Sequence, residues 1–166
     1  MRALRLRAAW LVGCLALAAC GLARPVPLDM SPEYRVVLGR VDITTFEVWE
    51  GVVDIERDDH TFTYQLPFGR NAYDFAIGLP RGRYRVMRIR GIKDSWSHPN
   101  DTVWDVKLGF DVGDEPAIYI GTLRFQSDFK QLRVSVEDEL DRTLALLRTR
   151  YSNLPDSVVR ALATRT

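Results

Sequence analysis

The sequence predicts a mostly β protein: an antiparallel β-sandwich of about seven or eight strands followed by a C-terminal α-helix. Two observations lead to this prediction. Short runs rich in β-branched and aromatic residues recur about every ten residues, with turn residues between them. Near the C-terminus the apolar period changes from two residues to between three and four, which is typical of a helix.

The first four expected strands cover residues 34–43, 48–55, 62–66 and 73–77. In the third strand, Phe62, Tyr64 and Leu66 alternate with polar residues, a period that indicates one buried face. The fourth strand alternates in the same way. The segment 67–71 between them, Pro-Phe-Gly-Arg-Asn, has the composition of a turn.

The last four expected strands cover residues 83–90, 103–112, 117–125 and 132–136. Residues 79–82, Leu-Pro-Arg-Gly, form a turn sequence because proline fixes φ at the second position and glycine suits the fourth. The alternation of the strand that follows slips between Val86 and Met87, which indicates either a bulge or an edge position. The strand 117–125 is the most apolar and is interrupted by Gly121.

A helix is expected over residues 140–151, where apolar residues recur after four, three and four positions. Acidic residues near its start and arginines near its end complement the helix dipole. The sequence Asn-Leu-Pro-Asp at 153–156 ends the pattern. We expect a short second helix over 157–163, and the longer helix should cover an edge or a face of the sandwich.

Two motifs resemble those of bacterial lipoproteins with prealbumin-like or carboxypeptidase-regulatory-like sandwiches: Leu-Pro-Arg-Gly-Arg-Tyr at 79–84 and Gly-Asp-Glu-Pro-Ala-Ile-Tyr-Ile-Gly-Thr-Leu at 113–123. In those families a Leu-Pro-x-Gly-x-Tyr hairpin is followed by a Gly-x-x-x-Tyr-x-Gly strand. The resemblance implies the sandwich fold, and it implies no catalytic residue.

The first twenty residues have the organisation of a secretory signal peptide. Residues 1–7 hold three arginines and no acid, and residues 8–20 are uncharged and largely apolar. A membrane-spanning helix needs about 20 apolar residues, so this segment is short for a permanent span. It ends in Leu17-Ala18-Ala19-Cys20, which resembles the lipobox of bacterial lipoproteins.

The lipobox resemblance implies a diacylglyceryl group on the Cys20 thiol and cleavage before Cys20. Stable anchoring by lipid takes two or more signals, which multiple acylation of one cysteine supplies. Gly21 follows the cysteine. An aspartate at this position tends to retain enterobacterial lipoproteins at the inner membrane, so we expect this protein to be anchored in the outer membrane and to face the periplasm. The alternative is that Cys20 merely ends an ordinary signal peptide.

The chain therefore divides into a signal peptide at 1–19, a lipidated tether at 20–33 and a sandwich domain with its helix at 34–166. Prolines favour an extended tether, and its 12 residues after Cys20, 21–32, would reach about 40 Å. Cleavage takes away three arginines and leaves 20 basic against 22 acidic residues, a balance that gives no support for nucleic-acid binding. The remaining domain has no cysteine, hence no thiol nucleophile.

The longest expected loop, 92–104, is a candidate binding loop because it combines tryptophans with polar side chains. Its candidate residues are Asp94, Trp96, His98, Asp101 and Trp104. On this reading the loop would stack on a sugar or a peptide. On the alternative reading, the two tryptophans cap one end of the core and pin the loop.

A second candidate is basic: the hairpin around 81–90 carries five arginines, Arg81, Arg83, Arg85, Arg88 and Arg90. It could face phosphates of lipopolysaccharide, anionic lipid or an acidic partner. The alternative is an edge strand whose charges prevent unwanted strand pairing.

The sequence lacks the motifs of common metal, hydrolase and nucleotide-binding sites. His60 and His98 show no metal-ligand spacing, and there is no Gly-x-Ser-x-Gly, phosphate-binding loop or dinucleotide motif, so we expect no metal and no cofactor. We expect a non-enzymatic module that binds or scaffolds a protein or component of the cell envelope. The alternatives are a periplasmic hydrolase acting on a glycan or peptide through the 92–104 loop, with His98 and Asp101 first to test, and a substrate-binding lipoprotein.

Overall fold

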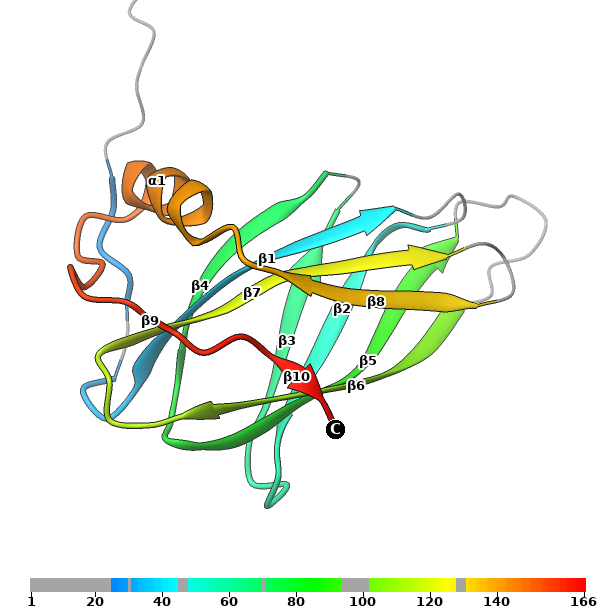
Figure 1. The fold of residues 1–166 in the computed structure, drawn as a ribbon, viewed down its shortest axis with the longest axis horizontal. Helices are drawn as coiled ribbons and strands as arrows, with labels where there is room; N and C mark the ends of the chain where they lie inside the picture. Colours follow the sequence, from blue (N-terminus) through cyan, green and yellow to red (C-terminus); the bar gives the residue numbers. More distant parts are fainter. Residues whose placement is uncertain (1–24, 30, 45–47, 70, 94–101, 128–130) are drawn as a thin grey trace, which may run out of the picture.

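The computed structural model of the 166-residue chain describes residues 25–29, 31–44, 48–69, 71–93, 102–127 and 131–166. The fold is a β-sandwich, as predicted, with a single short helix on its outside (Figure 1). Two sheets face one another and their inner sides form the main core.

The first sheet, called sheet 1, has the strand order β4–β1–β7–β8. Its strands are β4 (Tyr73–Leu79), β1 (Arg35–Thr44), β7 (Ala117–Ser127) and β8 (Leu132–Glu137). β1 runs antiparallel to β4 and parallel to β7, so sheet 1 is mixed rather than purely antiparallel. A two-residue strand, β9 (Val159–Arg160), pairs with the start of β7.

The second sheet, called sheet 2, has the order β10–β6–β5–β2–β3 and is antiparallel throughout. Its strands are β10 (Thr164–Arg165), β6 (Thr102–Val112), β5 (Gly82–Lys93), β2 (Val48–Arg57) and β3 (Thr63–Phe68). The register of β5 against β6 shifts between Val86 and Arg88, which confirms the predicted bulge. The edge position offered as its alternative is wrong, because β5 lies at the centre of sheet 2 between β6 and β2.

The main core consists of the inward residues of both sheets, at the alternate positions that the sequence pattern indicated. Val53 and Ile89 of sheet 2 and Leu123 and Phe125 of sheet 1 have no solvent exposure. Gly121, in β7, has φ of +105°, and a Cβ there would clash with Val136 Cγ1. This glycine therefore permits a backbone turn and a close contact in the middle of the most apolar strand.

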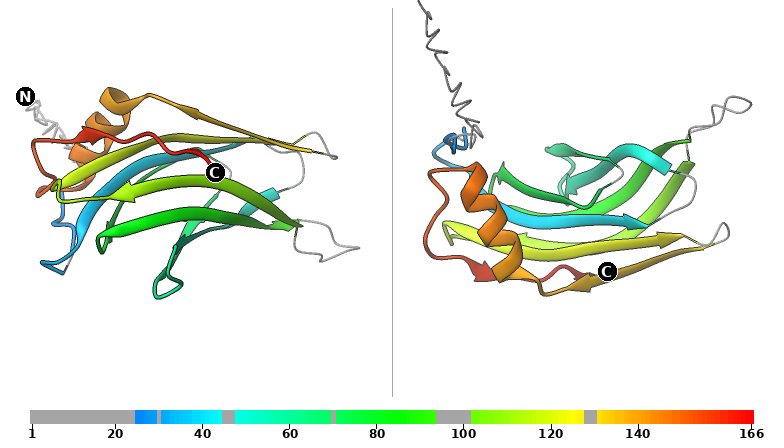
Figure 2. Two further views of the ribbon diagram at one scale, coloured as in Figure 1. Left: turned by 60° about the horizontal axis from the view of Figure 1, so that its bottom comes forward. Right: turned by 90° about the horizontal axis from the view of Figure 1, so that it is seen from above.

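The helix α1 (Leu140–Arg150) lies against the outer face of sheet 1, where it forms a second apolar cluster (Figure 2). Leu147 is fully buried there with Leu38 and Tyr119 of the sheet. Beneath the helix, Arg40 Nη1 lies 3.0 Å from both carboxylate oxygens of Asp74. The pairing satisfies a buried charge on a face that the helix removes from water.

The expected second helix over 157–163 is wrong, because this segment is extended and pairs with β7 of sheet 1. After β9 the chain continues along β7, where Ala161 N–H donates to the Tyr119 carbonyl and Ala163 N–H to the Ile120 carbonyl, each at 2.9 Å. It then crosses to sheet 2 and pairs with β6 as β10. Backbone groups on the edges of β7 and β6 thus outweigh a weak local preference for helix. The tail covers part of the side where β7 and β6 lie.

The described part of the expected tether does not extend freely. Val26 pairs in parallel with Tyr151 just after α1, with Val26 N–H donating to the Arg150 carbonyl at 2.9 Å. The Asn153 amide forms two hydrogen bonds with the backbone of Leu28, at 2.6 and 3.0 Å. We call this contact the clasp, residues 26–28 against 150–153. It shortens the reach that the extended chain would have.

Candidate functional site

The predicted binding loop lies mostly outside the described residues, which applies to Asp94, Trp96, His98 and Asp101. Trp104 is described: it belongs to β6, is partly buried and packs against the main core. For this one side chain the contact agrees with a core cap rather than with an exposed stacking surface. The hydrolase alternative gains no support from it.

The arginines of the 81–90 hairpin form ion pairs with acids of neighbouring segments. Arg90 Nη2 lies 2.8 Å from Asp54 Oδ1, and Arg88 Nε lies 3.4 Å from Asp54 Oδ2. Gln65 of β3 donates to the same carboxylate at 3.2 Å. Asp54 is only 7% exposed, and these three side chains contact its carboxylate.

The other three arginines are compensated in the same manner. Arg85 Nε lies 2.6 Å and Arg83 Nε 3.8 Å from the carboxylate of Asp58, and Arg81 Nη1 lies 2.7 Å from Asp114. The five arginines therefore share three carboxylates, which neutralise the positive charge of the hairpin only in part. We call this set of contacts the ion-pair lattice. Its role as a basic surface stays a prediction.

The histidine in the described part of the chain, His60, does not belong to a metal site. It lies in the turn between β2 and β3, is exposed, and hydrogen-bonds to Glu56. Within the described residues no group of three histidine, cysteine, aspartate or glutamate side chains is arranged to hold a metal ion. We therefore assign no metal or cofactor position there.

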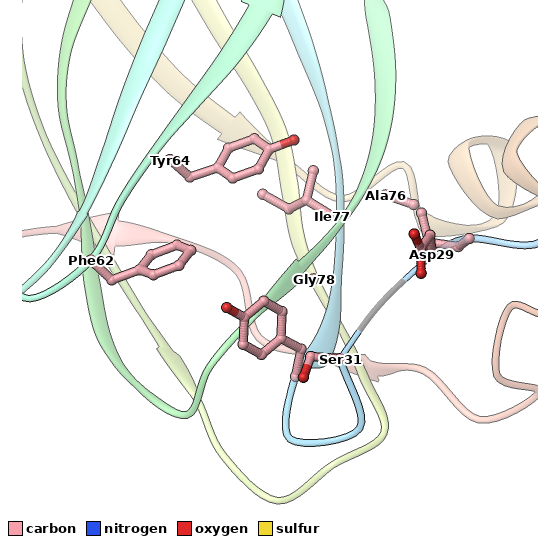
Figure 3. A pocket seen from close by; sticks show the side chains of 9 residues that line it. Asp29, Ser31, Phe62, Tyr64, Ala76, Ile77 and Gly78 are labelled. Atoms are coloured by element: carbon pink, nitrogen blue, oxygen red, sulfur yellow. The ribbon is translucent and has the colours of Figure 1, made fainter.

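A cavity of about 350 Å³ lies on the side of the sandwich where β3 and β4 run, opposite the side covered by the tail (Figure 3). Phe62 and Tyr64 come from the β3 region, and Ile77 and Gly78 from β4. The remaining lining residues are Leu28, Asp29, Ser31, Tyr34 and Ala76. We call this cavity the edge cavity, because β3 and β4 are the edge strands of their sheets on this side.

Aromatic packing fixes one wall of the edge cavity. The rings of Tyr34 and Phe62 meet edge to face with centroids 6.2 Å apart, and Phe62 meets Tyr84 in the same way at 6.4 Å. Tyr84 in turn stacks on Phe110 at 5.6 Å inside the core. A row of four rings therefore runs from the cavity into the centre of the sandwich, which holds the wall rigid.

Polar groups without partners among the described residues also face this cavity. The Asp29 carboxylate is exposed and forms no ion pair within the described chain, and it is the one charged side chain among the lining residues. The Tyr34 and Tyr64 side chains make ring or electrostatic contacts but no hydrogen bond with a described residue. Partial burial raises the pKa of Tyr64 above its ordinary value of 10.0, and its hydroxyl can donate a hydrogen bond. The arrangement suits a ligand with an apolar part, a hydrogen-bonding part and a cation.

Sequence reasoning missed the edge cavity although it found the residues. The alternation identifies Phe62 and Tyr64 as the buried face of a strand, and they are partly buried. The segment 25–34, with three prolines and two acids, reads only as a tether when it is taken alone, so no sequence signal placed it beside Phe62 and Tyr64. No family model, curated protein or solved structure is similar to this chain.

Proposed function

We propose that this protein is a lipoprotein of the bacterial cell envelope, anchored through Cys20 and facing the periplasm from the outer membrane, whose sandwich domain binds or scaffolds an envelope partner. The observation that carries the anchor is the tetrapeptide at 17–20 at the end of a basic and then apolar leader. Among the described residues, the helix α1 is neither long nor apolar enough to cross a bilayer.

The edge cavity supports the binding role. It combines a rigid aromatic wall with unengaged polar groups, which is the usual composition of a small recognition site. Binding sites of this kind use apolar area for affinity and a few polar groups for orientation. The ion-pair lattice gives less support to the binding role, since its arginines already have carboxylate partners.

The clasp suggests how the sandwich domain is oriented relative to the membrane. Four residues lie between Cys20 and Pro25, so an extended chain would place them at most about 18 Å apart. Because Val26 is held beside Tyr151, an anchor on Cys20 would keep the end of the domain that carries the clasp near the headgroups. The edge cavity includes Leu28 and Asp29, which follow directly, so it would open close to the membrane.

Labelling with a palmitate analogue tests the anchor. Wild-type protein should incorporate the label, begin at Cys20 by mass spectrometry and sediment with membranes. Cys20→Ser should lose the label and keep its leader, because the thiol that accepts the diacylglyceryl group is gone. The matched control is Cys14→Ser, which removes the other cysteine of the chain and should behave as wild type.

Two results would contradict the anchor: label that persists in Cys20→Ser, or an unmodified Met1 on the wild-type protein. Density-gradient separation tests the membrane assignment, since wild type should band with the outer membrane and Gly21→Asp should move to the inner membrane. Crosslinking in intact cells tests the binding role and should recover a specific partner. Failure to recover any partner would contradict the binding role.

A further inference from the structure

On the side away from β1, β4 pairs with no described strand and borders the edge cavity, where Ala76 is buried and Gly78 is partly exposed. Val36 N–H donates to the Pro116 carbonyl on the β7 side of β1, so the alternate residues Val37 and Gly39 face β4. Their partners in the antiparallel register are Ile77 and Phe75. The intervening residues of β4 must then direct their N–H and C=O groups away from β1.

A second contact agrees with this assignment. The guanidinium of Arg150 donates to the Asp74 carbonyl at 2.8 Å, from the side away from β1. By alternation, Ala76 and Gly78 face the same way as Asp74. Their outward backbone groups have no hydrogen-bond partner among the described residues, and both residues line the edge cavity.

The opposite wall of the cavity is apolar and aromatic. Phe62 and Tyr64 face it from the β3 side, and β3 pairs with β2 alone among the described strands (Figure 3). A chain lying between these walls would bond to β4 through its backbone and place alternate side chains against the rings. Free sheet edges are bound in this way by extended peptides, with pockets for alternate side chains supplying specificity.

We infer that the edge cavity binds an extended polypeptide segment, which adds to sheet 1 as a strand beside Ala76–Gly78, inserts an apolar or aromatic side chain against Phe62 and Tyr64, and places a lysine or arginine near Asp29. This inference deepens the proposed binding role and rests on it. A peptide is favoured over a glycan because the unfilled donors and acceptors of Ala76 and Gly78 have the spacing of a β-strand. A cation is favoured because Asp29 is the one charged side chain among the described lining residues and forms no ion pair with them.

The test uses the protein as isolated from cells in detergent. A phage-displayed library of random twelve-residue peptides is panned against it, and enriched peptides are synthesised and titrated by fluorescence anisotropy. Enriched sequences should alternate apolar with other residues and contain lysine or arginine. On binding, the amide signals of Ala76 and Gly78 should shift and become protected from hydrogen exchange.

Three variants separate the contacts. Ala76→Pro removes an outward N–H that bonds to no described residue, which edge strands tolerate, and it should weaken binding at least tenfold. Asp29→Lys reverses an exposed charge and should weaken binding at least fivefold. Asp111→Lys makes the same charge change at another exposed aspartate, on β6 of sheet 2, and should change binding less than twofold.

The inference is overturned if no peptide is enriched, if Ala76→Pro and Asp29→Lys bind as tightly as wild type, or if the protein instead dimerises through this edge. Binding of chitotetraose at the same residues, unaffected by Ala76→Pro, would also overturn it. A partner crosslinked equally by wild type and by both variants would leave the binding role intact and remove only this site. Loss of lipid label bears on the anchor alone.

Discussion

At the scale of single residues, Tyr84 links the fold to the candidate site. It is fully buried, stacks on Phe110, and its hydroxyl donates to the Pro80 carbonyl at 2.8 Å. Burial raises the pKa of Tyr84 to about 12. Because Phe62 packs on the edge of this ring, the same side chain that fills the core also supports the wall of the edge cavity.

The raised pKa of Tyr84 makes stability depend on pH in the alkaline range. In the unfolded chain this phenol ionises near the ordinary tyrosine pKa of 10.0, and in the folded chain only at about 12. Its contribution to stability is therefore complete below pH 10 and is lost as the pH rises toward 12. Tyr84→Phe should cost about 0.5–1.5 kcal/mol at pH 7 through the lost hydrogen bond. The stability gap between wild type and this variant should narrow by pH 11, as measured by urea unfolding.

The control for this experiment is Tyr34→Phe, whose hydroxyl has no hydrogen bond within the described residues. Its stability should follow that of wild type at both pH values. A gap for Tyr84→Phe that stays constant from pH 7 to pH 11 would mean that burial does not shift this ionisation.

At the scale of elements, α1 is joined to sheet 1 by apolar and polar contacts together. Leu147 enters the apolar cluster on the outer face, while Glu139 at the helix start receives hydrogen bonds from Thr122 Oγ1 at 2.8 Å and Arg142 Nη1 at 3.2 Å. The Thr122 bond lowers the pKa of Glu139, with the nearby arginines acting in the same direction. The helix therefore adds a second core to the sandwich rather than a loose cover.

Leu147→Ala should destabilise the protein by about 2–5 kcal/mol, because it opens a cavity at a fully buried position. Leu146→Ala removes the neighbouring leucine, which is 45% exposed, and should cost less than about 0.5 kcal/mol. Thermal and urea unfolding measure both. Equal effects of the two substitutions would show that α1 does not pack on sheet 1 by the face described.

The elements differ in how far the sequence predicts them. The eight longer strands and α1 follow from local apolar patterns. Strands such as β3 alternate buried and more exposed residues, whereas β1 and β7 are buried on both faces over most of their length, and α1 has one buried face. The segment 157–163 escaped prediction because its partner strand, β7, lies in a distant part of the sequence. The central position of β5 escaped for the same reason, since its arginines are matched by Asp54 and Asp58 on or beside β2.

At the scale of the whole molecule, the two open sides of the sandwich differ in what covers them. The tail from β9 to β10 crosses between the sheets on one side and places Ala163 in the main core. On the other side β3 and β4 remain unpaired at their outer edges within the described chain, and the edge cavity lies between them. No single-sequence pattern ranks strands as edge or central, so the site could not be predicted even though its aromatic residues were known.

The clasp should open more easily than the sandwich unfolds. Asn153→Ala removes two hydrogen bonds to Leu28 at an exposed position, and should speed hydrogen exchange of the Leu28 amide about fivefold. The free energy of global unfolding should change by less than about 0.5 kcal/mol. Asn71→Ala, at an exposed asparagine of the turn between β3 and β4, is the control and should leave this exchange rate unchanged. Unaltered exchange in Asn153→Ala would contradict the assigned contact.

The clasp also determines the mechanics of the molecule. A force applied to the chain ahead of Val26 meets the short pairing with Arg150, Tyr151 and Ser152 before it reaches any strand of either sheet. If these hydrogen bonds break, the segment before β1 can extend, so a force on the N-terminal end would lengthen this segment first. The clasp would therefore break at a lower force than the sandwich, and the two sheets would stay folded under tension.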